Sequence, residues 1–518
     1  MAAALLAFVL TGAASPSLTD VLDAHLRAIA ALHVKEPATL VTAGRLDGLD
    51  LHGTFQSWHD GTHERYDEML GLLAQRTLRT GDTQYVQNAN GDVRVLHGLL
   101  ARRQITEDFI DSEAFARHPE NDELLGSATL PDGRTVWRVR VAPPGGEPFE
   151  IALDATTSLI DQKAYVEGDA LATSTYDDYR VIKGALVPYL EVDSSGNHAF
   201  DVTSKVESVA VNDPIDAAIF APFTSTVVDA PEPVTVPLLS DRGHYFVRAS
   251  AGQTPLLFLV DSGSQGMFLD PGAAQRLALK TEGKIEVRGA QRTTGLGVAP
   301  LEAIDIGGAR LPLHVVSVID LHAVTYNGAT VDGVLGYPFF AAAEVRIDPD
   351  KMTMTIGKPG TLPSQGSAIA VDTDRELPET DAKINDVEGR FLLDTGNSNE
   401  LLVFHSFVRR HPSAVFYAGS KFTGNSGVGG SSSAVRAIVD QIEIGPFKLY
   451  NRYADVMLAE QGAFADRTEA GNIGLGTLSN FVFTFDLPHR TLFLEPARSF
   501  DNGRFRTREG SAPPFMRR

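Results

Sequence analysis

The chain has 518 residues, 43% of them apolar, and a formal net charge of −21. This length suffices for about three domains, and the acidic balance disfavours binding to nucleic acid or anionic lipid, both of which attract clustered Lys and Arg. The sequence contains no cysteine, which excludes disulfides, thiol catalysis and cysteine-type zinc sites.

The first residues have the pattern of a secretory signal. An apolar run from Ala2 to Leu10 precedes the small residues Thr11-Gly-Ala-Ala-Ser15, which is the arrangement of an apolar signal core and its cleavage site. We therefore predict a signal peptide over 1–15, cleaved near Ala14, and an exported protein, periplasmic or secreted. The alternative is the first turn of a buried helix. We expect no membrane span, because no run approaches about 18 apolar residues.

Residues 16–228 form the predicted N-terminal domain. Apolar residues at helical spacing predict a first helix, capped by Ser17 or Thr19: Leu18, Val21, Leu22, Leu26 and Ile29. From Ala38 to Phe223, short alternating segments separated by Gly-containing turns predict an antiparallel meander. Its clearest strands are Thr135–Val141 and Phe149–Leu153.

Two histidines in this region raise the question of a metal site. His59 and His63, with His52 nearby, have the i,i+4 spacing that places two ligands together on a helix. Asp60-Gly61 between them is a turn signal, so we interpret the segment as a polar hairpin tip. We predict neither a metal site nor an organic cofactor.

After the linker Asp229–Pro233 the chain repeats itself over 234–358 and 366–497, and a flexible tail is predicted over 498–518. Both repeats contain an apolar run followed by Asp, a hydroxyl residue and Gly: Phe258-Leu-Val-Asp-Ser-Gly-Ser264 and Phe391-Leu-Leu-Asp-Thr-Gly-Asn397. Burying an unpaired carboxylate is costly. Two Asp residues in the same setting therefore indicate a duplicated lobe in which the carboxylates meet.

Both repeats also close with the same elements. An apolar-apolar-Gly element follows each Asp motif, and we match Gly336 in the first repeat to Gly476 in the second. Each repeat then ends in a predicted hairpin: Glu344–Asp348 with Met352–Ile356, and Phe481–Asp486 with Thr491–Glu495. Asp348 and Asp486 precede the hairpin turns, and we interpret them as turn residues rather than acids.

From Val234 to Pro496 these motifs, in this order, resemble the tandem retropepsin-like lobes of the aspartic peptidase superfamily. The stretch Phe149–Phe220, which includes Tyr176-Asp-Asp-Tyr179 and Gly184-Ala-Leu-Val-Pro188, loosely resembles the half-barrel domains of the lipoprotein-carrier superfamily. The resemblance implies a mainly β chain. Two tandem β-barrel lobes would form a pseudo-dimeric aspartic peptidase, preceded by an α+β antiparallel half-barrel domain that in relatives can hold an acyl chain.

The resemblance to aspartic peptidases implies an aspartic endopeptidase that hydrolyses peptide bonds of a peptide or protein substrate through a water activated by Asp261 and Asp394. Two carboxylates about 3 Å apart cannot both ionise, so the pair would share one proton. Residues of the two motifs would support this dyad, with the two hydroxyls bonding across to the opposite lobe: Ser262, Gly263, Ser264, Thr395, Gly396 and Asn397.

Three points stay open in the sequence. Asn397 stands where the family usually carries a small hydroxyl or Ala, and either Asn397 itself or Ser398 would donate to Asp394. The aromatic residue that closes over a substrate is Tyr326, Tyr417 or neither, and Thr423–Ser433 is predicted as a loop over the cleft. The alternative function is a catalytically inactive envelope binding protein whose N-terminal sheet holds a lipid-like or peptide ligand. We expect a monomer, because the short linker between the repeats favours pairing within one chain.

Overall fold

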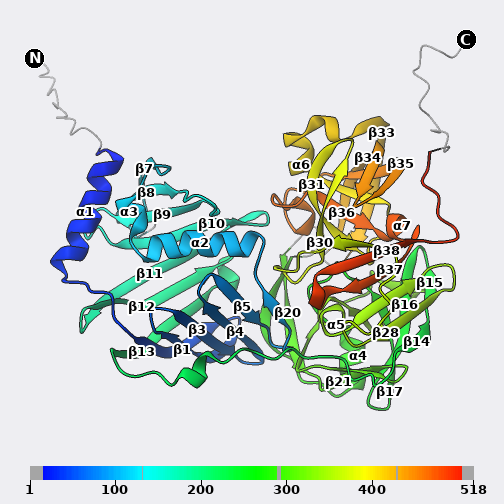
Figure 1. The fold of residues 1–518 in the computed structure, drawn as a ribbon, viewed down its shortest axis with the longest axis horizontal. Helices are drawn as coiled ribbons and strands as arrows, with labels where there is room; N and C mark the ends of the chain where they lie inside the picture. Colours follow the sequence, from blue (N-terminus) through cyan, green and yellow to red (C-terminus); the bar gives the residue numbers. More distant parts are fainter. Residues whose placement is uncertain (1–15, 131, 289–292, 428–429, 505–518) are drawn as a thin grey trace, which may run out of the picture. The chain divides into compact units, whose positions relative to one another are not determined.

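The computed structural model describes residues 16–130, 132–288, 293–427 and 430–504. The predicted signal peptide and the last part of the predicted tail lie outside these residues. The chain is mainly β, as predicted (Figure 1), and its contacts divide it into two compact units. Unit 1 consists of residues up to Glu36, Arg102–Tyr165 and Thr173–Glu191. Unit 2 consists of Pro37–Ala101, Val166–Ala172 and the chain from Val192 onward.

Unit 1 packs helices against antiparallel strands that neighbour one another in the order β12-β11-β10-β9-β8-β7. The bounds of its elements are α1 (Leu18–Ala31), α2 (Leu99–Asp111), α3 (Ala114–Arg117), β7 (Glu123–Thr129), β8 (Thr135–Val141), β9 (Phe149–Asp154), β10 (Ile160–Glu167), β11 (Ala170–Ile182) and β12 (Ala185–Ser194). Its core joins Val21 and Leu22 of α1 to Phe115 of α3 and to Phe149 and Ile151 of β9.

The predicted first helix is confirmed, and its cap is Ser17. The Ser17 hydroxyl accepts a hydrogen bond from the Asp20 amide while the Asp20 carboxylate accepts from the Ser17 amide, which satisfies two amides that the helix leaves unpaired. The meander prediction missed α2. Its buried residues include Arg103 and Thr106, and these polar side chains on the inner face remove the apolar periodicity that marks a helix.

The N-terminal strands of unit 2 also form an antiparallel series, in the order β6-β5-β4-β3-β2-β1-β13. Their bounds are β1 (Leu40–Gly48), β2 (Leu51–His59), β3 (His63–Leu70), β4 (Leu73–Thr80), β5 (Thr83–Gln87), β6 (Val93–Val95) and β13 (Val202–Val211). The segment between His59 and His63 is a hairpin tip, as interpreted from the sequence. The Asp60 carboxylate there accepts the amides of Thr62 and His63.

The first lobe contains β14 (Val234–Pro237), β15 (Leu239–Asp241), β16 (His244–Ala251), β17 (Thr254–Val260), β18 (Phe268–Leu269), α4 (Pro271–Arg276), β19 (Glu282–Arg288), β20 (Thr293–Pro300), β21 (Ala303–Ile306), β22 (Ala309–Pro312), β23 (Val315–Val318), β24 (Thr325–Tyr326), β25 (Ala329–Thr330), β26 (Gly333–Leu335), α5 (Tyr337–Ala342), β27 (Glu344–Asp348) and β28 (Thr353–Gly357). Its main sheet has the order β19-β20-β23-β18-β26-β17-β16-β21-β22.

The second lobe contains β29 (Ser367–Ala370), β30 (Glu379–Ile384), β31 (Val387–Asp394), β32 (Leu401–Phe404), α6 (His405–Arg410), β33 (Phe416–Gly427), β34 (Gly430–Ile444), β35 (Phe447–Met457), β36 (Gly471–Gly474), α7 (Leu475–Leu478), β37 (Phe481–Asp486) and β38 (Thr491–Pro496). Its sheet has the order β30-β31-β36-β32-β35-β34-β33.

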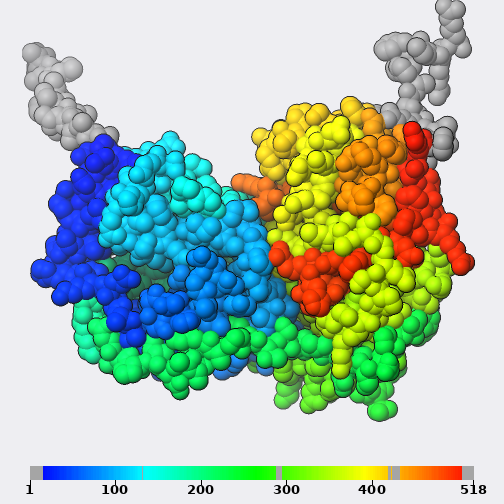
Figure 2. All heavy atoms as spheres, viewed as in Figure 1, coloured from blue at the N-terminus to red at the C-terminus, as the bar shows by residue number. Residues whose placement is uncertain are grey.

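The two lobes share a third sheet, whose order is β14-β28-β27-β37-β38-β29. The order is symmetric about the β27–β37 pair, and both predicted closing hairpins lie in it. In the space-filling view, red residues from the end of the second lobe lie against yellow-green residues from the end of the first (Figure 2). A single apolar core continues through both lobes and includes Phe258, Phe340, Phe391 and Phe483. The lobes therefore fold as one body.

Candidate active site

Each Asp motif begins where a buried strand ends. Phe258 and Val260 on β17, and Phe391 and Leu393 on β31, are fully buried, so the apolar runs fix the point at which each loop leaves the core. The main-chain amide of Gly263 then donates to Oδ1 of Asp261 over 3.0 Å. The amides of Gly396 and Asn397 donate to Oδ1 of Asp394 over 2.9 and 3.0 Å. These bonds orient each carboxylate within its own loop.

The two loops are locked to one another by a reciprocal set of hydroxyl bonds. The Ser262 hydroxyl donates to the Leu393 carbonyl over 2.6 Å and accepts the Thr395 amide over 3.0 Å. The Thr395 hydroxyl in turn donates to the Val260 carbonyl and accepts the Ser262 amide, both over 2.9 Å. Ser262 and Thr395 are fully buried. The pairing lies within one chain, and both hydroxyls bond across to the opposite lobe.

The carboxyl groups of Asp261 and Asp394 meet across this lock. They share a side-chain hydrogen bond. A methyl group added to Gly263 would lie under 3.0 Å from the Asp394 carboxyl, and one added to Gly396 would lie under 3.0 Å from that of Asp261. Both glycines are therefore required by close approach, since a side chain at either position would separate the acids.

Burial sets the protonation of the pair. Desolvation raises the pKa of Asp261 well above its usual range, and the neighbouring charge of Asp394 raises it further. Desolvation also raises the pKa of Asp394, but hydrogen bonds from Asn472, from Asp261 and from the loop amides oppose that rise. The two acids thus have unequal environments, and together they favour a state with one shared proton.

A glycine supports each Asp loop from behind, but the predicted match between the repeats was wrong. β26 runs parallel to β17 with Leu335 opposite Val260, and β36 runs parallel to β31 with Ile473 opposite Leu393. The counterpart of Gly336 is therefore Gly474, and not Gly476. A methyl group on Gly336 would press on the Ser264 carbonyl, and one on Gly474 on the Asn397 carbonyl.

Strand β36 contains a further site residue that the sequence did not predict, Asn472. With Gly474 matched to Gly336, Asn472 occupies the position of Val334 in an otherwise apolar triplet. Asn472 is buried, and its Nδ2 donates to Oδ2 of Asp394 over 2.8 Å. The sequence does contain a signal for this role, namely an amide side chain at a position that is apolar in the first repeat. The signal is recognised only when the two repeats are aligned by the register of their strands.

Neither of the expected donors to Asp394 has that role among the described contacts. The side-chain oxygen of Asn397 accepts the amide and the side-chain nitrogen of Asn399, both over 3.0 Å, and only its backbone amide reaches Asp394. In the first lobe the Ser264 hydroxyl donates to the Gly266 carbonyl over 3.3 Å. Asn472 is therefore the side chain that supplements the loop amides at Asp394.

A histidine also lies beside the second loop. His244, at the start of β16, lies near the charge of Asp394 and the backbone of Gly396, and desolvation lowers its pKa below the usual range for histidine. The neutral imidazole adds no positive charge next to the acid pair at neutral pH.

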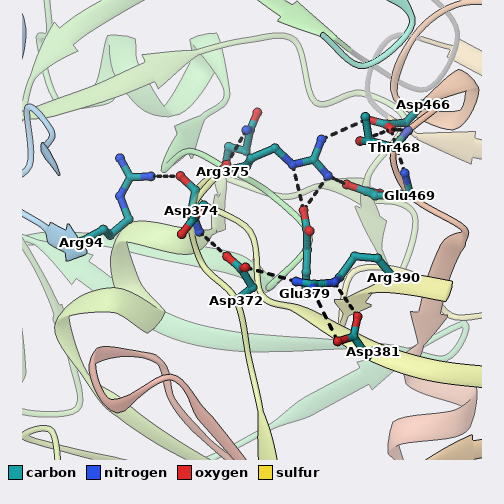
Figure 3. A network of polar contacts seen from close by, with 11 residues as sticks. Arg94, Asp372, Asp374, Arg375, Glu379, Asp381, Arg390, Asp466, Thr468 and Glu469 are labelled. Atoms are coloured by element: carbon teal, nitrogen blue, oxygen red, sulfur yellow. Dashed lines mark hydrogen bonds and ion pairs between the residues drawn. The ribbon is translucent and has the colours of Figure 1, made fainter. Parts of the chain in front are cut away.

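The segment before β30 contacts the first Asp loop. The Gln265 side chain donates to the Arg375 carbonyl over 2.8 Å. Arg375 is largely shielded from solvent, with 11% of its side chain exposed, and faces three carboxylates, as Figure 3 shows: Glu379, Asp466 and Glu469. Desolvation lowers the pKa of Arg375, but the three carboxylates outweigh it and raise that pKa above its usual value. Because one cation cannot neutralise three buried carboxylates, desolvation still raises the pKa of Glu469 well above its usual range.

Strand β6 and the turn after it also contact this segment, within unit 2. Arg94 donates to the Asp374 carbonyl and pairs with Glu376 over 2.9 Å (Figure 3 shows the former). The amides of His97 and Gly98 donate to the Asp374 carboxylate. Asp374 is the neighbour of Arg375, which accepts the hydrogen bond from Gln265. These contacts therefore connect the N-terminal strands of unit 2 to the first Asp loop.

The structure also places the other residues that the sequence singled out: the two aromatic candidates, the predicted loop and the two Asp residues before the hairpin turns. Tyr326 packs its ring 5.3 Å from that of Phe246, and Tyr417 is exposed on β33. The predicted loop Thr423–Ser433 forms the end of the β33–β34 hairpin, whose tip lies outside the described residues. Asp348 accepts the Lys351 amide at its turn, and Asp486 contacts His489. In the part of the chain that the structure describes, no three His, Asp or Glu residues are grouped as metal ligands would be.

One family of known proteins matches a segment in each lobe. Residues 247–339 and 380–476, one segment in each lobe, match the family described as aspartyl protease. The two lobes have an aspartyl-protease-like fold. Their segments include both Asp motifs and both supporting glycines, Gly336 and Gly474. A search of the curated proteins finds no match.

Three solved structures are similar to parts of the chain. An aspartic proteinase from Irpex lacteus has 15% identity and a TM-score of 0.35, and the match covers 52% of this chain and 98% of that one. An outer membrane lipoprotein-sorting protein domain from Vibrio parahaemolyticus has 9% identity and a TM-score of 0.27, with 38% and 95% covered. A LolA superfamily protein from Nitrosomonas europaea has 14% identity and a TM-score of 0.26, with 40% and 99% covered.

Proposed function

We propose that the protein is an aspartic endopeptidase that hydrolyses peptide bonds through the acid pair of Asp261 and Asp394. The observation that carries this proposal is the meeting of two carboxyls, the buried Asp394 and the half-buried Asp261, which are hydrogen-bonded to each other on loops locked together by the hydroxyls of Ser262 and Thr395. A shared proton in a desolvated site supplies a base and an acid at the same point.

The reaction uses both protonation states of the pair. The ionised carboxylate takes a proton from a water molecule, whose oxygen bonds to the scissile carbonyl carbon, while the protonated carboxyl gives its proton to the carbonyl oxygen. In the second step the proton taken from water passes to the amide nitrogen and the C–N bond breaks. A hydroxyl proton of the tetrahedral intermediate returns to the other carboxylate, which restores the starting state.

Peptide cleavage by the purified chain tests this function. We expect cleavage of a mixed peptide library at acidic to neutral pH, inhibition by a statine-type inhibitor, and a loss of about 10²–10⁴-fold in kcat/KM for Asp261→Asn and for Asp394→Asn separately. Circular dichroism and thermal melts show whether each variant is folded. Activity that survives either single substitution would contradict the mechanism.

We also propose export of the chain and action outside the cytoplasm. This rests on the apolar run and the small residues over 1–15. Mass spectrometry of the N-terminus of the chain, produced in a bacterial host with its leader, is expected to find a start near Ser15. A retained Met1 would contradict export through this leader. Among the described residues, no helix is long and apolar enough to cross a membrane.

A second candidate function is ligand binding by the N-terminal sheet, and one cavity favours it. The cavity, of about 480 Å³, lies in unit 2 and is lined by apolar side chains of the N-terminal strands, such as Leu46, Leu70 and Val202, together with residues of the first lobe. Burial, with Asp193 nearby, raises the pKa of Glu68 in its wall to about 7. Native mass spectrometry tests this function, since a co-purified lipid-like or peptide ligand without peptidase activity would support it over the first.

A further inference from the structure

The two Asp loops differ at one matched position behind the acids. In β26 the residue between Gly333 and Leu335 is Val334, and in β36 the residue between Gly471 and Ile473 is Asn472. Val334 pairs with Leu259, which lies two residues before Asp261. Asn472 pairs with Leu392, which lies two residues before Asp394. The duplication therefore places a methyl-bearing side chain behind one acid and an amide behind the other.

The amide changes the balance of donors between the two acids. Asp394 accepts hydrogen bonds from the amides of Gly396 and Asn397 at Oδ1 and from Asn472 at Oδ2. Asp261 accepts the amide of Gly263 and shares that of Gly396. Each N–H donor stabilises a negative carboxylate, and a bond to a charged group is worth more than one to a neutral group. The donors therefore favour the negative charge on Asp394.

The orientation of the Asn472 amide decides the sign of this effect. With Nδ2 towards Asp394, as the structure has it, the amide supports an ionised Asp394. The opposite orientation would place a carbonyl oxygen against Oδ2 and would require Asp394 to carry the proton. The two loop amides at Oδ1 favour the first orientation, because they also stabilise the ionised form.

The charged and titratable groups around Asp394 do not reverse the preference of the negative charge for Asp394 over Asp261. Asp261 faces it from the opposite loop and shares a hydrogen bond with it. His244 faces it from β16, with Asp241 beside that histidine. Burial keeps the imidazole neutral at neutral pH, so it does not compete with Asn472 as a source of charge stabilisation.

We propose that Asn472 is a positioning residue that assigns the roles within the acid pair. It holds Asp394 as the carboxylate that takes the proton from water and leaves Asp261 as the carboxyl that protonates the carbonyl oxygen. This assignment rests on the proposed peptidase function for its chemistry, but the asymmetry itself exists in the resting protein and is measurable without turnover.

Carbon-13 NMR of the chain labelled at the Asp carboxyls tests the assignment. The signals of the pair are identified by their absence in Asp261→Asn and Asp394→Asn. In the wild-type chain we expect Asp394 to ionise in the first of two steps and Asp261 in the second. The reverse order, or equal ionisation of both carboxyls in the first step, overturns the proposal. This measurement needs no variant at position 472 and no peptidase activity.

The variant Asn472→Val, which copies the matched residue of the first lobe, tests the cause. We expect the first ionisation of the pair to move to higher pH, and kcat/KM on the acid side of the pH profile to fall about tenfold or more, as loss of a bond to a charged group predicts. The plateau of kcat is expected to change less. Val334→Ala is the matched control. It removes apolar packing at the matched position of the first lobe, but it should not shift the acid side of the kcat/KM pH profile.

The outcomes separate this proposal from the proposed function. A chain that cleaves no peptide, but shows the ordered ionisation with its first step moved to higher pH in Asn472→Val, retains the effect of Asn472 on the acid pair and loses the peptidase function. If the chain cleaves peptides, but the acid side of its kcat/KM pH profile does not shift in Asn472→Val, the peptidase function stands and the proposed role of Asn472 is wrong.

Discussion

The Asp261 and Asp394 loops have the same backbone frame but different surroundings. Both accept amides of their own loop, both meet a glycine of the opposite lobe, and both lie beside a hydroxyl that bonds across. The second loop alone has an amide side chain behind it, Asn472, where the first has Val334. The duplicated motif thus brings the acids together, while residues outside it make their surroundings unequal.

A second matched pair differs even more in burial. Counting back the same 133 positions that separate Asp261 from Asp394 places Arg242 opposite Arg375. Arg242 is exposed, whereas Arg375 is largely shielded from solvent and pairs with three carboxylates (Figure 3). The segment that supports the first Asp loop through Gln265 is therefore fixed by a buried ionic network, a feature that its counterpart at Arg242 does not share among the described contacts.

The largest expected effect comes from separating the acids. Gly263→Ala and Gly396→Ala each insert a methyl group under 3.0 Å from the opposite carboxyl, and a displacement of about 1 Å can cost about 10²-fold in rate. We expect at least that loss in kcat/KM from both variants. Gly272→Ala, in the first turn of α4, is the control and should cleave normally. A fully active Gly396→Ala would show that the acids do not need to meet.

The next effect compares the two arginines. Arg375→Met leaves three buried carboxylates without their cation, which should reduce the free energy of unfolding by about 3–5 kcal/mol. Arg242→Met, at the matched exposed position, should change it by no more than about 0.5 kcal/mol. Urea denaturation at neutral pH measures both. Equal losses from the two variants would contradict the network's role in stability.

The smallest effect concerns pH. The folded-state pKa of Asp261 is raised, so its proton is kept in the folded chain at pH values where the unfolded chain has released it. This contribution is fully present below the unfolded pKa of about 3.9 and is lost as pH rises through the folded pKa. Asp261→Asn cannot ionise. The melting temperature of Asp261→Asn, relative to that of the wild type, should therefore increase as pH rises to neutrality.

Melts at a series of pH values measure this gain, with the exposed Asp82→Asn as a control that should follow the wild type. A gap between Asp261→Asn and the wild type that stays constant with pH would mean that the acid is not perturbed by burial.

Much of the lobe architecture was predictable because it depends on local patterns. The apolar run before each Asp, the hydroxyl after it and the closing hairpins each fix one strand or turn, and two copies in the same order identify a duplication. Helix α2 was not predictable, because Arg103 and Thr106 face inward and make tertiary contacts: Arg103 lies over the Tyr165 ring, and Thr106 donates to the Glu147 carbonyl.

At the site, the sequence located the acids but not their asymmetry. The loop residues Ser262, Thr395 and the two glycines lie beside the acids, where the motif placed them. Asn472 lies 78 residues from Asp394 in sequence, and only the parallel pairing of β31 with β36 brings it to the carboxylate. A side chain's role in such a position depends on strand register, which a single sequence does not specify when two glycines, Gly474 and Gly476, both fit the pattern.

The pH profile of kcat/KM for the wild-type chain, measured beside Asp261→Asn and Asp394→Asn on one peptide substrate, tests the central claim most directly. A single acid pair that shares one proton predicts a bell-shaped profile whose two limbs belong to the pair, and activity that is lost in both variants. A profile with one limb only, or a variant that retains cleavage, would contradict the claim that Asp261 and Asp394 act together.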